Sequence, residues 1–193
     1  IRRSRSVAVV LPSAWTVDAL GSGLALARFV GQNGKPAEVI CAGFGGAPHL
    51  ACLPGLENVK PDLCAARHTV LTMPLVGGLH DLKHTEADGM LKIMITPKRG
   101  MIEHGAIASA AGEWRHDLIV AIAVRELKEV GPLLADHGRF FEETPVINID
   151  CHPENERYGA INIIDLRASS AAELVNSLIE TADAKAIDQE IAT

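Results

Sequence analysis

The sequence predicts an α/β fold, a doubly wound and mainly parallel sheet flanked by helices. Three short and continuous apolar runs carry this prediction, over Ser6–Leu11, Asp117–Val124 and Pro145–Asp150. Such runs are typical of strands that are buried on both faces, as they are in parallel sheets. Helical patterns alternate with the runs, and this alternation favours a parallel sheet covered by helices. We therefore expect the three runs to be central strands.

The N-terminal part reads as one βαβ unit. The strand Ser6–Leu11 is followed by a helix over Ala19–Val30, for which Asp18 is the predicted N-cap. Glycines at positions 31 and 34 end the helix, and a second strand follows over Ala37–Cys41.

The middle of the chain is rich in Gly, Pro and Leu and gives weaker patterns. We expect a short helix near Pro48–Leu53 and strands over His68–Leu75 and Met90–Thr96. The second of these strands alternates, which indicates one wetter face. A turn over Pro97–Gly100 follows, with a short helix after it.

The C-terminal part completes the alternation. A helix over Arg125–Ala135 is predicted after the central strand, and a short strand over Ala160–Asp165 follows the third apolar run. A helix over Ser170–Thr181 begins with the pattern of a capping box. Asp188 is predicted to cap one more helix, which the end of the sequence cuts short.

Composition narrows the class of protein. A chain of 193 residues suits one domain, and we treat 1–193 as a single α/β domain. The formal charge of −6 and the lack of an extended basic tract argue against binding of duplex nucleic acid. No apolar run approaches the roughly 18 residues of a membrane span. The first residue is Ile1, so we expect the sequence to be a piece of a longer polypeptide.

Cysteine spacing bears on metal binding and on the cellular compartment. Four cysteines are present and none forms a C-x-x-C pair, which argues against a zinc knuckle. Without a signal peptide, they are expected to be reduced thiols of a cytoplasmic protein.

Asp150, Cys151 and His152 follow the third apolar run directly. In an open parallel sheet, the carboxyl ends of the strands line the crevice where ligands bind. An acid, a thiol and an imidazole in a row could ligate a metal there. The alternative is that Asp150 caps the turn and Cys151 packs as a small apolar residue. The sequence leaves both readings open.

The other strand ends offer few chemical groups. Asp18 follows the first strand, and Glu126 follows the central strand at the start of a predicted helix, where an acid is favoured in any case. Ser22 lies early in the first helix, where an anion could approach the helix N-terminus. Asn155 lies in the turn after the third run. Ser22 and Asn155 are the candidate residues for binding a nucleotide or phosphate.

Three segments together resemble the motifs of the DHH phosphoesterase family. They are VDALGSGLALARFVGQNGK, DLIVAIAVRELKEVG and INIDCHPENERYGAINIIDLRASSAAEL, and their order and spacing agree with the family over most of the chain. The resemblance implies a two-manganese site. Such a site hydrolyses phosphoesters of short oligonucleotides, pAp, cyclic dinucleotides or polyphosphate.

The sequence departs from the family where the metals should lie. Pro12 holds the position of the first-motif histidine, Thr16 that of an aspartate, and Ala123 that of the bridging aspartate. Cys151 replaces the first histidine of the D-H-H triplet. The fourth-motif aspartate and the usual C-terminal substrate-binding domain would lie beyond the end of this sequence.

Three positions of the resemblance are retained, namely Asp18, Asp150 and His152. Asp150 and His152 are the remaining candidate catalytic residues. Asp18 and the replacement residue Cys151 are the candidate metal ligands. Loss of a bridging carboxylate and of further ligands removes the charge that holds the cations and activates water.

We therefore expect a DHH-like domain that has lost most of its two-metal site, needs no cofactor, and binds, scaffolds or assembles with itself or a protein partner. The alternative is an active manganese-dependent phosphodiesterase or phosphatase, with ligands supplied from outside this segment. A further option is binding of a short nucleotide without hydrolysis, through Ser22.

Overall fold

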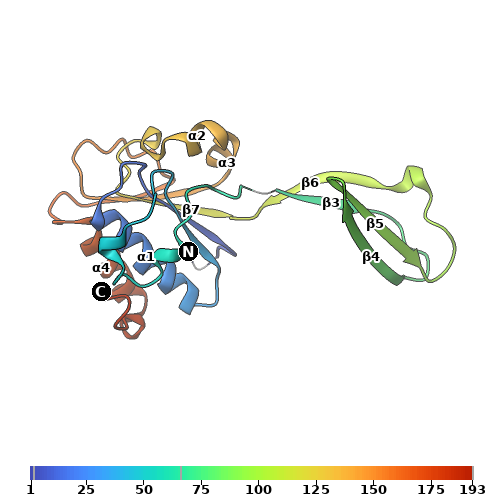
Figure 1. Cartoon of the computed structure of the whole chain (residues 1–193), viewed down its shortest axis with the longest axis horizontal. Coiled ribbons are helices and arrows are strands. Elements are labelled where there is room, and N and C mark those ends of the chain that lie inside the picture. The colour runs from blue at the N-terminus through green and yellow to red at the C-terminus, as the bar shows by residue number, and fades with distance from the viewer. Residues whose placement is uncertain (2, 66, 193) are drawn as a thin grey trace. The chain divides into compact units, whose positions relative to one another are not determined.

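The computed structural model describes residues 1, 3–65 and 67–192 and contains a five-stranded, all-parallel sheet. The strand order is β2-β1-β7-β8-β9 (Figure 1). The strands are β1 (Val7–Val10), β2 (Ala37–Ile40), β7 (Leu118–Ile122), β8 (Val146–Asp150) and β9 (Ile161–Ile164). The predicted fold class is confirmed, and the three apolar runs form the three interior strands.

The chain packs as two compact units. Residues 1–66 and 114–193 form the first, which we call the sheet unit, and residues 67–113 form the second, which we call the ribbon unit. The sequence analysis did not separate the ribbon unit from the rest. Among the described residues, no helix has both the length and the hydrophobicity that crossing a membrane requires.

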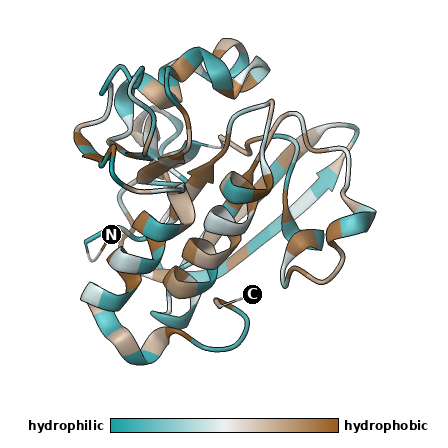
Figure 2. Ribbon diagram, turned by 90° about the vertical axis from the view of Figure 1, so that its left-hand side faces the viewer, coloured by the Kyte–Doolittle hydropathy of each residue, from teal (hydrophilic) through white to brown (hydrophobic). Residues whose placement is uncertain are grey.

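Helices cover both faces of the five-stranded sheet. The helices α1 (Val17–Gln32) and α4 (Ala171–Asp183) lie on one face, and α2 (Pro132–Asp136) and α3 (Gly138–Glu143) lie on the other (Figure 1). Figure 2 shows hydrophobic ribbon along the strands and mixed hydropathy along the helices, which present one side to the sheet and one to solvent.

The strand β1 shows why its sequence is apolar at every position. Val7 and Val9 pack with the α1 and α4 side of the core, whereas Ala8 and Val10 pack with the α2 and α3 side. Successive side chains of a strand point to opposite faces, so a strand with helices on both faces buries all of them.

The prediction of one helix over Arg125–Ala135 is wrong. A 3-10 turn over Leu127–Val130 is followed by Gly131, which has a φ of 67°, and then by α2. Pro132 provides no backbone donor to continue a helix, and Gly131 adopts a left-handed φ that L side chains avoid. The Leu and Val stripe is therefore divided between two short helical pieces.

Asp188 does not begin a helix. Its carboxylate accepts a hydrogen bond from the Ile191 backbone nitrogen (2.9 Å) and pairs with Arg28 of α1 (2.7 Å). The Arg28 side chain holds the pKa of Asp188 low, at about 2. The last residues form a turn held to α1 by this pair.

The ribbon unit consists of two two-stranded sheets. The strand β3 (Arg67–Thr72) pairs with β6 (Ala108–Trp114), and β4 (Leu79–Ala87) pairs with β5 (Met90–Pro97) in an antiparallel hairpin. The strands expected over 68–75 and 90–96 are confirmed in their main part, but β4 was missed. Its sequence, LHDLKHTEA, is too polar to be recognised as a strand.

Short 3-10 turns make up the other helical elements. They are η1 (Pro48–Leu50), η2 (Leu56–Asn58), η3 (His104–Ala106), η4 (Leu127–Val130) and η5 (Ala184–Ala186). The first and third correspond to the short helices expected near 48–53 and after the turn at 97–100.

Candidate functional site

The strand order places the predicted site residues at one edge of the sheet. The chain runs from β1 to β2 on one side and to β7 on the other, so the order reverses between β1 and β7. Ligands of open α/β sheets bind at the carboxyl edge beside such a reversal. Pro12, Ala123 and Cys151 follow the carboxyl ends of β1, β7 and β8, respectively, and these strands are neighbours.

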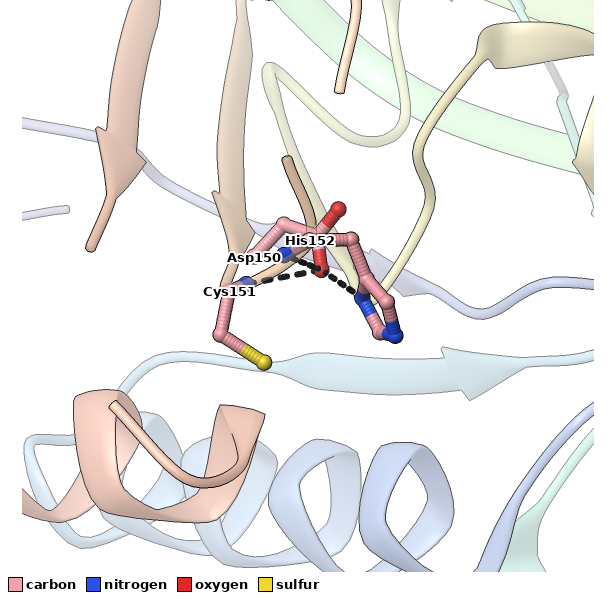
Figure 3. A group of neighbouring side chains, drawn as sticks. All are labelled: Asp150, Cys151 and His152. Carbon is pink, nitrogen blue, oxygen red and sulfur yellow. Dashed lines mark hydrogen bonds and ion pairs between the residues drawn. The ribbon is translucent and has the colours of Figure 1, made fainter. Parts of the chain in front are cut away.

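Asp150 is fully buried at the end of β8, and its carboxylate is contacted by four nitrogen atoms. Figure 3 shows the three contacts that Cys151 and His152 make. The Oδ1 of Asp150 accepts from the backbone nitrogens of Cys151 (2.8 Å) and His152 (3.3 Å) and lies 2.7 Å from His152 Nδ1. Its Oδ2 accepts from the Asn155 side-chain amide (2.8 Å). Asp150 therefore caps the turn after β8, which was the alternative to metal ligation.

Asn155 links the turn after β8 to the end of β7. Its amide nitrogen donates to Asp150 and to the Val124 carbonyl (3.1 Å). Its oxygen accepts from the Asn148 side chain (2.8 Å) and from the Arg157 backbone nitrogen (2.8 Å). We call Asn148, Asp150, His152 and Asn155 the β8 polar network. Asn155 is thus tied up by protein groups on both its nitrogen and its oxygen.

Two polar residues near Asp150 and Asn155 were not predicted from the sequence. Asn148 is fully buried in the middle of β8, and the Tyr158 hydroxyl donates to the Val124 carbonyl (3.1 Å). Burial raises the pKa of Tyr158, so its hydroxyl remains a donor. A polar residue inside an apolar strand was the available signal for Asn148, because buried amides need partners.

Cys151 lies in an acidic environment. Burial raises the pKa of its thiol, and the charges of Asp150, Asp18 and Glu173 raise it further. In Figure 3 its side chain points toward the helical layer, whereas the His152 ring folds back onto the Asp150 carboxylate. Reactive cysteines lie in electropositive surroundings. Cys151 therefore lacks the electropositive surroundings of a nucleophilic cysteine. The effect of the Asp18 charge on its pKa also shows that the two residues lie near each other.

Asp150, Cys151 and His152 also form a possible cation site, because one ligand atom from each lies within 4.8 Å of the others. The set offers one oxygen, one sulfur and one nitrogen. A sulfur donor suits softer cations such as zinc, whereas manganese prefers oxygen-rich sites. Ala123 contributes only a methyl group, where the resemblance led us to expect a bridging carboxylate. The residues present here do not fit a two-manganese centre.

Asp18 is placed near the cluster but is not the N-cap of its own helix, so that prediction is wrong. The N-cap of α1 is Thr16, whose hydroxyl accepts from the Ala19 backbone nitrogen (3.1 Å). The Asp18 carboxylate accepts instead from the backbone nitrogens of Ala171 (2.8 Å) and Ala172 (2.9 Å), the first two residues of α4. Asp18 thus joins the two helices.

We expect Asp18→Ala to lower the free energy of unfolding by about 1–2 kcal/mol, because it leaves two donors at the start of α4 without an acceptor. Urea unfolding measures the change. Asp136→Ala is the control, since it removes an exposed carboxylate from α2 and should change stability little. Equal effects of the two substitutions would contradict a capping role for Asp18.

The remaining predicted positions have structural surroundings. Pro12 is buried and its carbonyl accepts from the Cys41 thiol (3.4 Å). Ala123 has a φ of 54°, in the left-handed region, and its backbone nitrogen donates to Ile149 (2.9 Å). Ser22 is buried, and its hydroxyl has no partner among the described residues. It lines a cavity of about 340 Å³ between α1 and α4. A nucleotide-binding role for Ser22 stays a prediction.

A scan against protein-family models finds no match, and a search of the curated proteins finds none either. A search of solved structures finds, among others, an exopolyphosphatase-related protein from Bacteroides fragilis with a TM-score of 0.66 and 19% sequence identity. The alignment covers 99% of this chain and 44% of that one. This chain therefore spans less than half the length of that protein, and the likeness concerns the fold alone.

Proposed function

We propose that this chain is a phosphoesterase-like domain of DHH type that has lost most of its two-metal site and acts by binding and assembly. The observation that carries the proposal is Ala123. It holds the position where the resemblance expects a bridging carboxylate, at the end of the strand next to Asp150. The structural likeness to an exopolyphosphatase-related protein supports the phosphoesterase-like fold.

A two-metal site depends on the negative charge of its ligands. Two divalent cations repel each other, so such a site needs anionic ligands, a bridging group among them, to hold both cations in place. The two retained carboxylates already serve as structural acceptors. Asp18 binds two backbone donors of α4, and both oxygens of Asp150 have donors.

The purified chain is expected to contain manganese far below stoichiometric amounts and to show no manganese-dependent hydrolysis of short oligoribonucleotides or pAp. Elemental analysis and product chromatography measure the two quantities. Robust metal-dependent turnover by the unmodified chain would replace this proposal with the alternative, an active manganese-dependent phosphodiesterase or phosphatase.

Restoring the missing ligands tests the same proposal from the other direction. Pro12→His, Thr16→Asp, Ala123→Asp and Cys151→His together should raise manganese affinity, measured by calorimetry. The matched control restores the other three and leaves Ala123 unchanged. Aspartate tolerates a left-handed φ better than most residues, so the backbone at position 123 accepts it. An equal affinity of the two variants would mean that position 123 is not a ligand position.

A further inference from the structure

The ribbon unit has no core of its own. All of its residues 67–113 are described, and none of them is buried. It carries most of the exposed large hydrophobic side chains of the described chain: Val70, Leu71, Leu75, Val76, Leu79, Leu82, Met90, Leu91, Ile93, Met94, Met101 and Ile107. Exposed apolar surface on this scale marks an interaction site. The four methionines of the sequence all lie in this unit, and methionine adapts well to binding surfaces.

Four large apolar side chains of the β4–β5 hairpin lie on one face. Residues directly opposite each other in an antiparallel pair share a face, as do alternate residues of one strand. The register pairs Leu82 with Ile95, and it places Ile93 and Leu91 on the same face in the next two rows. We call this the hairpin apolar face. The same face also carries His84 and Glu86. The opposite face carries Asp81, Lys83, Thr85, Lys92 and Thr96, together with Ala87, Met90 and Met94.

The net charge of the ribbon unit indicates which kind of partner binds the hairpin apolar face. The unit holds five of the 18 basic and five of the 24 acidic residues, so its formal charge is zero, and the sheet unit carries the whole −6. A surface without net charge has no complementarity to a strongly acidic or basic partner. Loss of net charge also favours self-association, whereas two sheet units of −6 repel each other. A second copy of the ribbon unit brings the same exposed apolar side chains and no net charge, so it is the partner that matches this face.

We propose that the hairpin apolar face packs against the same face of a second copy of this chain, giving a twofold-symmetric dimer. A standard interface uses roughly 20–30 residues from each partner, and a unit with none of its 47 residues buried can supply them. This inference rests on the assembly role proposed above and names the partner as a second copy of the chain. The dimer and the loss of hydrolysis are tested separately, because molar mass measures the first and turnover measures the second.

Sedimentation of the full chain over a range of concentrations tests the dimer, with Ile93→Lys and Thr96→Lys as a matched pair. Both are exposed, β-branched residues of β5, and both substitutions add one positive charge, but they lie on opposite faces. The unmodified chain should sediment as twice 20.5 kDa. Ile93→Lys should raise the dimer dissociation constant roughly a hundredfold, because the twofold axis places the new charge in the interface twice. Thr96→Lys should leave it unchanged.

Thiol cross-linking provides a second measurement, which detects the dimer directly and does not depend on a substitution that weakens it. In a background with Cys52 and Cys64 changed to serine, Ile93→Cys should give a covalent dimer with a short bismaleimide, and Thr96→Cys should give none. A monomer at every concentration, or a dimer that Ile93→Lys leaves intact, would overturn the proposal. Capture of a different protein on the hairpin apolar face, with no self-association, would do the same.

Discussion

Asn155→Ala is expected to lower the free energy of unfolding by about 3 kcal/mol, the scale of a buried charged group that loses its donor. The substitution leaves Oδ2 of the buried Asp150 without a described hydrogen bond and removes the nearer of two acceptors of the Asn148 amide. The Val124 carbonyl keeps the Tyr158 hydroxyl as a donor, so the loss is centred on Asp150. Urea unfolding followed by indole fluorescence measures the change.

Asn162→Ala is the control for this prediction. Asn162 also lies beside Asn148, but its main partners are the backbone groups of Gly159, and it has no described contact with Asp150. Its removal should cost about 1 kcal/mol, as for an ordinary hydrogen bond. If both variants lose the same free energy of unfolding, the contacts of Asn155 within the β8 polar network do not explain its contribution to stability.

Asn155→Asp adds a pH signature to the same test. The new carboxylate lies beside Asp150, and the like charge and the burial raise the pKa of the introduced aspartate in the folded state above its unfolded value of about 4. The folded state of the variant then binds a proton more strongly than the unfolded state does. Its deficit in stability should be smallest below pH 4 and should grow as the pH rises through the folded pKa. A deficit that is independent of pH would contradict the contact with Asp150.

Gly43→Ala is expected to destabilise the protein by about 3 kcal/mol, at the upper end of the cost of overpacking. A Cβ at this position would lie 1.8 Å from the backbone oxygen of Ser13. Ser13 cannot withdraw freely, because its backbone nitrogen (2.7 Å) and its hydroxyl (3.0 Å) both donate to the Glu129 carbonyl. The clash therefore involves the loops that follow β2, β1 and β7 at the carboxyl edge of the sheet.

Gly45→Ala is the matched control, two residues away in the same loop. Nothing lies within 4 Å of a Cβ there, and neither glycine has a left-handed φ. This control should change the unfolding midpoint little or raise it slightly, because alanine restricts the unfolded chain. Equal stability of the two variants would mean that the loop after β2 moves away from Ser13 without cost.

The interior strands of the sheet were predicted well because burial on both faces makes a strand apolar at every position, and such a run is easily recognised in the sequence. A strand such as Val7–Val10 is apolar at every position only when helices cover both of its sides. The residues Asp150, Cys151 and His152 were likewise brought together, since neighbours in sequence stay neighbours in a turn.

The errors arose where a side chain acts at a distance or where no core exists. Asp18 fits a local cap by spacing, but its acceptor role depends on α4, more than 150 residues later. The strand β4 was missed because apolar periodicity reports burial, and the ribbon unit buries nothing. The Gly131–Pro132 break, by contrast, was visible in the sequence and was outweighed by the apolar stripe around it.

The pairing of β3 with β6 bears on how such a chain evolves. The Arg67 side chain donates to the Gly112 carbonyl (3.1 Å), so the two ends of the ribbon unit lie side by side. A segment whose two ends lie side by side can change in length without moving the strands on either side of it. Each doubling of its length costs the host only about 0.6 kcal/mol in loop closure. One deletion or acquisition event can therefore remove or add the whole ribbon unit while the order of β2, β1 and β7 stays the same.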